Sequence, residues 1–190
     1  KEALVYVGGF KCHTQHSLEI LGQFMAMTKL SQYVYPICFS WLCGKVLSYR
    51  YARETASNDR NRANFTALLR GLAAAGIHNV HIMTHSLGVQ TLMAAFQDKS
   101  DGSRSDSSQC FRLDTSFSSK TFETEEEGVM TCKTITMLNP DFPVDAFVDS
   151  GFLSLRRICN HITVVGDRND QPLYYSQFVN GAFNYLGYSQ

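Results

Sequence analysis

Short apolar runs alternate along this chain with longer stretches in which apolar residues recur at helical spacing. Apolar runs of strand length occur at 3–10, 33–41, 79–84, 134–138 and 161–165. Helical spacing is clear at 16–30, 61–75 and 87–96, and weaker at 146–157 and 174–183. Such alternation is typical of βαβ units, so the pattern predicts a mostly parallel sheet of about five strands with helices on both faces. Pro36 is awkward for a central strand, because proline has no N–H to donate.

The segment 99–128 interrupts this rhythm. It is rich in Ser and Asp, has little apolar content, and carries an acidic cluster formed by Glu123, Glu125, Glu126 and Glu127. Segments of low hydrophobicity bury too little apolar surface to offset the entropy lost when the chain is ordered. We therefore expect a largely disordered surface insertion, and the functional alternative is a regulatory or partner-binding loop.

Composition is typical of an ordinary globular domain. The 190 residues are 44% hydrophobic and 18% charged, and 17 basic residues balance 17 acidic ones to a formal net charge of zero. We expect one domain over 1–190. Nucleic acid and anionic membrane are excluded as the main partner, because both require a concentrated basic field. No apolar run approaches the roughly 18 residues of a transmembrane helix.

Six cysteines are scattered through the chain without a CxxC pair or a histidine at zinc spacing. We interpret them as reduced, mostly buried thiols of an intracellular protein, so we expect neither a disulfide framework nor a metal site. The chain begins at Lys1, inside a predicted strand and without an initiator methionine. This start suggests a piece of a longer protein.

One serine stands in a sharp-turn pattern between a predicted strand and a predicted helix. Thr84 to Gly88 reads Thr-His-Ser-Leu-Gly, a variant of G-x-S-x-G with Thr84 at the first glycine position. In a nucleophile elbow, small neighbours allow the strained turn, and the serine oxygen projects beside helix N-terminal amides. We therefore interpret Ser86 as a candidate nucleophile. The alternative is a serine that caps the helix, with Gly88 incidental.

The loop after the first predicted strand offers a second element of such a site. Gly8 and Gly9 precede Phe10 there, and glycines let the backbone approach a neighbour closely. An oxyanion hole needs two backbone donors, so the amides of Phe10 and Leu87 are the candidate pair. Taken alone, the same residues also fit a simple glycine turn.

A serine nucleophile also needs an acid and a base. Asp167 and Asp170 compete for the acid position after the last predicted strand, and Asp141, after the preceding strand, is a further candidate. In this chain order a histidine should follow the acid, but none follows Asp170. None of the six histidines has the placement expected of the base: His13, His16, His78, His81, His85 and His161.

Together these motifs resemble those of an α/β-hydrolase family called domain of unknown function 900, a group of presumed serine esterases. The resemblance covers nearly the whole chain apart from 99–128. The matching segments follow one order: Leu4 to Phe10, Phe39-Ser40-Trp41, Tyr49 to Ala56, Thr84 to Gly88, Asn139-Pro140-Asp141 with Asp145 and Phe147, and Asn169-Asp170 with Leu173 and Ser176. The chain departs from the family pattern at Gly8, where the family has His, and at Ala52, where it has Asp.

The resemblance implies an α/β-hydrolase-like three-layer sandwich with a Ser-Asp-His triad. Ser86 is then the nucleophile, Asp170 rather than Asp167 is the acid, and the histidine lies after one more strand, beyond Gln190. The implied reaction is hydrolysis of a carboxylic ester, either a small molecule or a lipid, without metal or organic cofactor. The alternative is a non-catalytic α/β-hydrolase-like module, in which the cleft or the 99–128 insertion binds a ligand or a protein partner.

Overall fold

A parallel β-sheet forms the centre of the computed structural model, which describes residues 1–41, 48–98, 102–113, 128–167 and 186. In these residues the sheet has six strands: β1 (Glu2–Val7), β2 (Tyr35–Phe39), β3 (Asn79–His85), β4 (Phe111–Arg112), β5 (Met130–Leu138) and β6 (Ile162–Val165). The strand order is β2-β1-β3-β5-β4, and β6 also pairs with β5. Every pairing is parallel, which confirms the predicted mostly parallel sheet.

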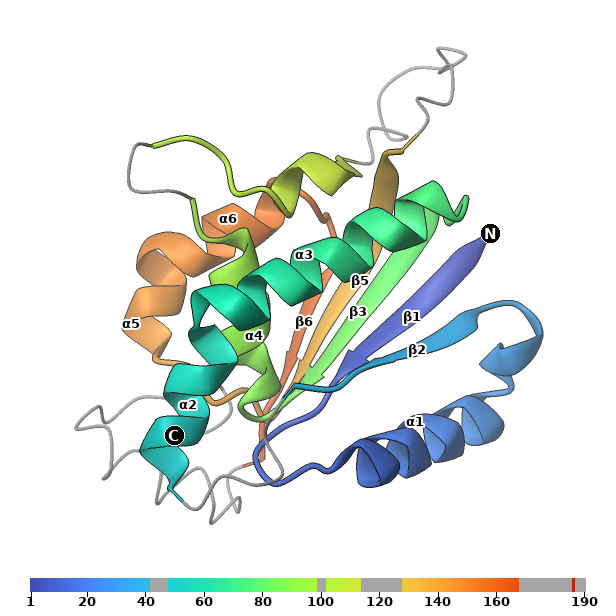
Figure 1. The fold of residues 1–190 in the computed structure, drawn as a ribbon, viewed down its shortest axis with the longest axis horizontal. Helices are drawn as coiled ribbons and strands as arrows, with labels where there is room; N and C mark the ends of the chain where they lie inside the picture. The colour runs from blue at the N-terminus through green and yellow to red at the C-terminus, as the bar shows by residue number, and fades with distance from the viewer. Residues whose placement is uncertain (42–47, 99–101, 114–127, 168–185, 187–190) are drawn as a thin grey trace.

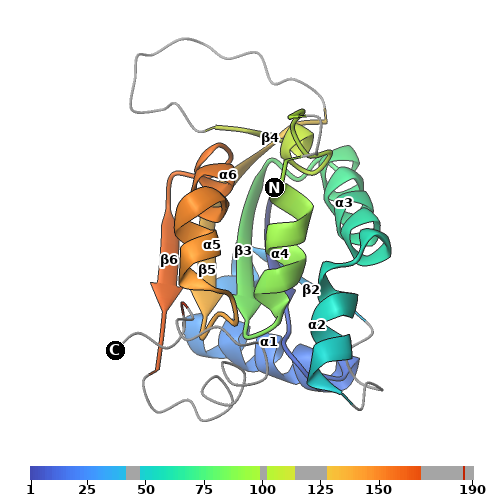
Figure 2. The same cartoon turned by 90° about the vertical axis from the view of Figure 1, so that its left-hand side faces the viewer.

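Helices cover both faces of the sheet. They are α1 (Thr14–Thr28), α2 (Tyr49–Ser57), α3 (Asp59–Ala74), α4 (Gly88–Phe96), α5 (Val144–Ala146) and α6 (Phe152–Arg156), with the short turns η1 (Leu30–Gln32), η2 (Ser108–Cys110) and the π-helical η3 (Phe147–Gly151). The helix α1 lies on one face, and α2 to α6 lie on the other (Figure 1, Figure 2). This is the three-layer arrangement that the sequence predicts. None of the helices described is long and apolar enough to cross a membrane.

Side chains of β1 pack against the helices on both faces of the sheet. Ala3, Val5 and Val7 are fully buried in the larger apolar core with α3 and α4, whereas Leu4 and Tyr6 pack with α1 in the smaller core. Because successive side chains of a strand point to opposite faces, a continuous apolar run marks a strand that is buried on both faces. The run at the start of the chain therefore correctly predicts an interior strand.

The proline in β2 is accommodated because β2 lies at an edge of the described sheet. Pro36 is opposite Leu4 of β1, and β2 has no second neighbour among the described strands. An edge strand pairs on one side, so a residue without an N–H is tolerated there. The strand is also shorter than the predicted run at 33–41.

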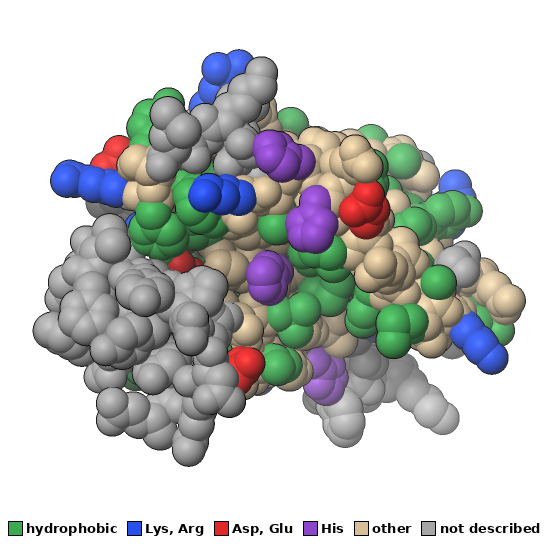
Figure 3. All heavy atoms as spheres, turned by 90° about the horizontal axis from the view of Figure 1, so that it is seen from below, with side chains coloured by type: hydrophobic (Ala, Val, Ile, Leu, Met, Phe, Trp, Pro, Cys, Tyr) green, Lys and Arg blue, Asp and Glu red, His purple; other side chains and the backbone are tan. Residues whose placement is uncertain are grey.

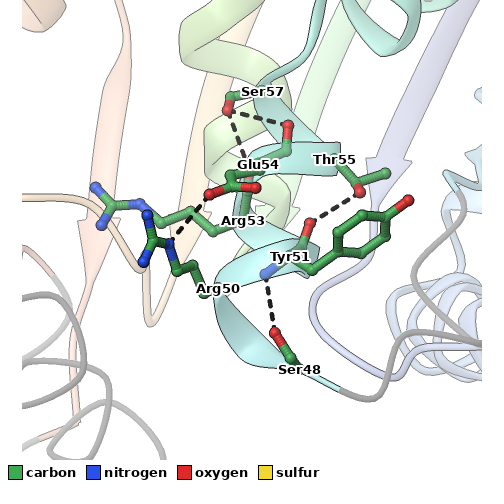
Figure 4. A network of polar contacts seen from close by, with 7 residues as sticks. All are labelled: Ser48, Arg50, Tyr51, Arg53, Glu54, Thr55 and Ser57. Atoms are coloured by element: carbon green, nitrogen blue, oxygen red, sulfur yellow. Dashed lines mark hydrogen bonds and ion pairs between the residues drawn. The ribbon is translucent and has the colours of Figure 1, made fainter.

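The sequence patterns do not predict α2. Its first turn is capped by Ser48, whose hydroxyl oxygen accepts a hydrogen bond from the Tyr51 N–H at 3.2 Å, and further polar contacts follow along the helix (Figure 4). The buried residues of α2 are Ala52 and Ala56. Two alanines make too weak an apolar stripe to stand out in the sequence.

Within the segment 99–128, where the sequence predicts a largely disordered insertion, residues 102–113 are ordered and pack on the core. Ser107 is fully buried, and its hydroxyl oxygen lies 2.6 Å from that of Thr66 on α3. Phe111 begins β4 and packs in the larger core. Serines suggest solvent exposure in a sequence, but hydroxyls that are hydrogen-bonded inside the protein can be buried.

Besides the candidate acid Asp170, two predictions fall outside the described residues. One is the acidic cluster within 114–127, together with its proposed role in binding a partner. The other is the helix expected at 174–183.

Candidate active site

The carboxyl ends of β1 and β3 bring two of the sequence motifs side by side. The two strands are neighbours, with Val7 opposite Thr84. The loop after β1 and the turn after β3 therefore leave the sheet together, at the edge where parallel sheets bind ligands (Figure 1). We call the loop from Gly8 to Cys12 the glycine loop.

Ser86 occupies a sharp turn between β3 and α4. Its φ is +49°, in the left-handed region, which costs a non-glycine residue about 1–3 kcal/mol. Two backbone hydrogen bonds hold the turn: Ser86 N–H donates to the Leu138 carbonyl at 3.0 Å, and Val89 N–H donates to the Ser86 carbonyl at 3.2 Å. Ser86 remains partly exposed. The backbone thus bends sharply where the pattern from Thr84 to Gly88 predicts it.

The geometry does not support the interpretation of Ser86 as a helix cap. The N-cap of α4 is Leu87, without a side-chain capping bond. Gly88 is not incidental either, because a Cβ there would lie 2.3 Å from the Val7 carbonyl oxygen. At Gly9 a Cβ would lie 2.8 Å from the Cβ of Ser86. Both glycines are therefore required by the close approach of the glycine loop to the turn.

Side chains from two other segments hold the glycine loop. The buried Trp41 donates its indole N–H to the Gly8 carbonyl at 2.9 Å. The ring of Phe10 packs edge-on against that of Tyr49, with centroids 5.7 Å apart. Within the described residues, neither the Phe10 amide nor the Leu87 amide donates a hydrogen bond to the protein. Phe10 is partly exposed, whereas Leu87 is fully buried.

The space beneath the glycine loop explains one departure from the family pattern. A Cβ at Gly8 would lie 2.7 Å from Ser17 Oγ and 3.2 Å from Cys12 Cβ, so a larger residue would require Ser17 to move. Burial raises the pKa of the Cys12 thiol above its usual value near 9. Cys12 is therefore a neutral thiol at neutral pH and does not compete with Ser86 as a nucleophile.

Asp141 lies against the same turn, after β5. It is 1% exposed, and its N–H donates to the Ser86 carbonyl at 3.3 Å. Its carbonyl accepts from Gln90 Nε2 at 2.6 Å, and its carboxylate accepts a hydrogen bond from the Tyr49 hydroxyl. Neither Tyr49 nor Gln90 is among the site residues predicted from the sequence, and the family resemblance from Tyr49 to Ala56 is the one sequence signal that points to Tyr49.

The other acidic candidates follow β6. Asp167 is exposed two residues after the strand, and Asp170 lies outside the described residues. The Asn139 N–H donates to the Val165 carbonyl at 2.7 Å, which joins the carboxyl ends of β5 and β6. The loop that carries both acids therefore starts at the same edge of the sheet as Ser86.

Four of the histidines are exposed, two at the opposite end of the sheet and two at the start of α1. His78 and His161 precede β3 and β6, at the opposite end of the sheet, and both are exposed. His13 and His16 are exposed at the start of α1. No side chain among the described residues hydrogen-bonds to Ser86 Oγ.

The remaining two histidines project from β3 toward the α1 face. Met83 packs in the smaller core with α1, so alternation along the strand places His81 and His85 on the same face. His81 Nδ1 lies 2.8 Å from Thr134 Oγ1, and its Nε2 lies 3.0 Å from a Glu2 carboxylate oxygen. Viewed from the side on which α1 lies, histidine side chains spread over the surface (Figure 3). Alternation thus places the His85 side chain on the α1 face of the sheet.

Neither a cavity nor a metal cluster adds to the site in the part of the chain that the structure describes. A cavity of about 330 Å³ lies beside α4, where Gln90, Met93 and Phe142 line it together with η3 and α6, but Ser86 does not. In the same residues, no group of three or more His, Cys, Asp or Glu side chains could hold a metal ion.

A comparison with protein families gives one match. A family model described as alpha/beta hydrolase of unknown function (DUF900) matches residues 1–189. No curated protein and no solved structure matches the chain.

Proposed function

The chain belongs to the family of alpha/beta hydrolases of unknown function (DUF900), and on that premise we propose that it is a serine hydrolase that cleaves a carboxylic ester. One observation carries this proposal: the turn at Ser86 is left-handed and lies between a parallel strand and a helix, closely packed by Gly9 and Gly88. Strain of this kind persists where the surroundings enforce it, and it serves to present a side chain at the top of a sheet.

In the proposed reaction, Ser86 Oγ attacks the ester carbonyl while a histidine accepts its proton. The carbonyl oxygen becomes an oxyanion, and the amides of Phe10 and Leu87 stabilise it, each worth roughly 3 kcal/mol of the barrier. The tetrahedral intermediate then collapses: the ester C–O bond breaks, and the alcohol leaves with the proton that the histidine returns. Water next attacks the acyl-serine, which releases the carboxylic acid and restores the Ser86 hydroxyl. The substrate is a small-molecule or lipid ester, and no metal or cofactor takes part.

Asp170 orients the histidine in this proposal, with Asp167 as the competing acid. A single strand, β5, separates β3 from β6, so the carboxyl ends of β3 and β6 lie about 10 Å apart. An imidazole between a serine and a carboxylate fits a gap of that size. By the family resemblance, that histidine follows one more strand beyond Gln190.

The second candidate function is a module that binds a ligand or a protein without catalysis. It is favoured by the absence, among the described residues, of a hydrogen bond from any histidine to Ser86 Oγ. The two candidates differ in whether Ser86 reacts with an electrophile.

A fluorophosphonate probe tests the proposal, because it reacts with activated serines. The probe is added to the natural full-length protein, to Ser86→Ala and to Ser150→Ala, a control at an exposed serine of η3. We expect labelling of the wild type and of Ser150→Ala and none of Ser86→Ala, with peptide mapping to Ser86.

Two results would reject an activated Ser86. One is equal labelling of the wild type and Ser86→Ala. The other is no labelling of a wild-type protein whose circular dichroism and unfolding transition show that it is folded, and this second result favours the binding module.

A further inference from the structure

We propose that Tyr49 and Asp141 form a positioning pair that holds the glycine loop against the turn at Ser86. The inference rests on the proposed hydrolase function, because the position of the loop matters to a reaction if the Phe10 amide receives the developing negative charge. Neither Tyr49 nor Asp141 is assigned a contact with the reacting atoms, and both act through the backbone that they hold.

Asp141 is tied to the turn through its backbone. Its N–H donates to the Ser86 carbonyl at 3.3 Å, and its carbonyl accepts from the Gln90 side chain, in the first turn of α4, at 2.6 Å. The residue is 1% exposed. A buried carboxylate needs hydrogen-bond donors, so its orientation is set by the donors that surround it.

Tyr49 links that carboxylate to the glycine loop. Its hydroxyl donates to Asp141 Oδ2, and its ring meets the Phe10 ring edge-on at an interplanar angle of 82°. A hydrogen bond to an ionised carboxylate is stronger than one between neutral groups, and an edge-on aromatic pair contributes about 0.5–1.5 kcal/mol. A continuous series of contacts therefore runs from the turn at Ser86 through Asp141 and Tyr49 to Phe10.

The glycine loop has a conformation that needs such support. Lys11, next to Phe10, has a φ of +57°, in the left-handed region. A non-glycine residue keeps this conformation when its surroundings enforce it. Trp41 holds the start of the loop at the Gly8 carbonyl, and Tyr49 holds its middle at the Phe10 ring.

The direction of the Asp141 carboxylate separates this role from that of a triad acid. The carboxylate is bound by a hydroxyl from α2, which packs on α4 and lies on the Phe10 side of the turn. We therefore assign Asp141 to the oxyanion side of the site, and in the proposed reaction the acid position stays with Asp170 or Asp167.

The inference predicts a loss of rate rather than of substrate affinity. Oxyanion donors act over a narrow range of distances, and a displacement of 1 Å can cost about 100-fold in rate. We expect Tyr49→Phe and Asp141→Asn each to lower kcat for p-nitrophenyl acetate roughly 10- to 100-fold, with KM within about twofold of wild type. Because both residues act through one contact, the double variant should be no slower than the slower single variant.

Tyr51→Phe is the matched control. Tyr51 is on the same helix and is 61% exposed, and among the described residues it forms hydrogen bonds through its backbone rather than its hydroxyl (Figure 4). The control should keep the wild-type kcat. Equal rates for Tyr49→Phe and wild type would overturn the inference, and so would fully additive losses in the double variant.

Hydrogen exchange of the natural full-length protein separates this inference from the proposed function. We expect Tyr49→Phe to raise the exchange rate of peptides covering Gly8 to Cys12, whereas Tyr51→Phe leaves it unchanged. If the folded wild type neither hydrolyses esters nor reacts with the probe, the hydrolase function fails, and exchange alone decides whether Tyr49 holds the loop. Unchanged exchange in Tyr49→Phe overturns the inference whatever the activity.

Discussion

The carboxyl ends of β3 and β6 belong to one sheet, and each is expected to supply a group of the triad, but they are built differently. Strand β3 is paired on both sides, and Leu87, which follows it, is fully buried. Among the described strands, β6 pairs with β5 alone, and Val165 at its end is 45% exposed. The serine is thus placed by the core of the protein, whereas the acid follows a strand that the core hardly constrains.

Substitutions at the two ends should therefore have unequal effects. Near β3 a larger side chain would clash with backbone or with fully buried side chains, so stability and reactivity should fall together. Near β6 the same larger side chain would extend into solvent, so the fold should tolerate it.

The largest effect is expected for Gly88→Ala. The new Cβ would lie 2.3 Å from the Val7 carbonyl oxygen, which is backbone and cannot rotate away, so we expect a loss of about 3 kcal/mol or more in the free energy of unfolding. Gly22→Ala on α1 is the control, because no atom lies within 4 Å of its Cβ position, and it should gain up to about 1 kcal/mol. Urea denaturation measures both, and similar stabilities would contradict the close packing of the turn.

The next effect concerns the anchor of the glycine loop. Trp41→Phe removes the indole N–H and leaves the Gly8 carbonyl without that donor, which should cost about 2 kcal/mol of stability and slow probe labelling of Ser86. Tyr35→Phe, at a side chain of the edge strand β2 that is 55% exposed, should change neither quantity measurably. Wild-type labelling in a folded Trp41→Phe would show that this bond does not position the loop.

The same substitution at one valine in each strand compares directly how much β3 and β6 contribute to stability. Val80→Thr places a hydroxyl at a fully buried position in β3, which should cost about 1–2 kcal/mol. Val165→Thr makes the same change at the exposed end of β6 and should stay within about 0.5 kcal/mol of wild type. Thermal unfolding of both variants measures the difference, and equal losses would mean that the end of β6 is packed as closely as β3.

The smallest effect is a pH dependence at the β1 end of the site. Burial raises the pKa of the Cys12 thiol above its usual value near 9. In that pH range the folded protein holds more protons than the unfolded chain, so stability is complete below pH 9 and falls as the pH rises above it. Cys12→Ala should make this fall shallower by at most about 1.4 kcal/mol per pH unit, measured by urea denaturation between pH 8 and 10. If the slope of stability against pH is the same in Cys12→Ala and wild type, Cys12 is not the source of the pH dependence.

The pKa of the Cys159 thiol, near β6, is shifted in the opposite direction. A hydrogen bond from Cys132 lowers the pKa of Cys159 to about 7, while the same pairing and burial raise that of Cys132. The thiol environments thus also differ between the two sides of the sheet.

Local patterns were enough to predict the core strands and the turn at Ser86. A strand buried on both faces must be apolar throughout, and a sharp strand-to-helix turn needs a small residue where the backbones approach each other. Both requirements therefore produce a pattern that can be recognised within a few residues of sequence. The same reasoning failed for α2, which buries two alanines, and for Ser107, whose hydroxyl is buried beside Thr66. In those places the partner that permits burial is distant in the sequence.

The chain by itself thus specified a parallel sheet, the site of its sharpest turn and the residues that flank it, because each depends on neighbours in the sequence. The folded protein alone revealed the link from Ser86 through Asp141 and Tyr49 to Phe10, since Tyr49 and Asp141 are 92 residues apart and meet when the sheet aligns their segments. It also revealed that the Asp141 carboxylate accepts a hydrogen bond from Tyr49 of α2. A carboxylate can act as an acid or as a support according to the donors around it, and those donors are placed by tertiary packing.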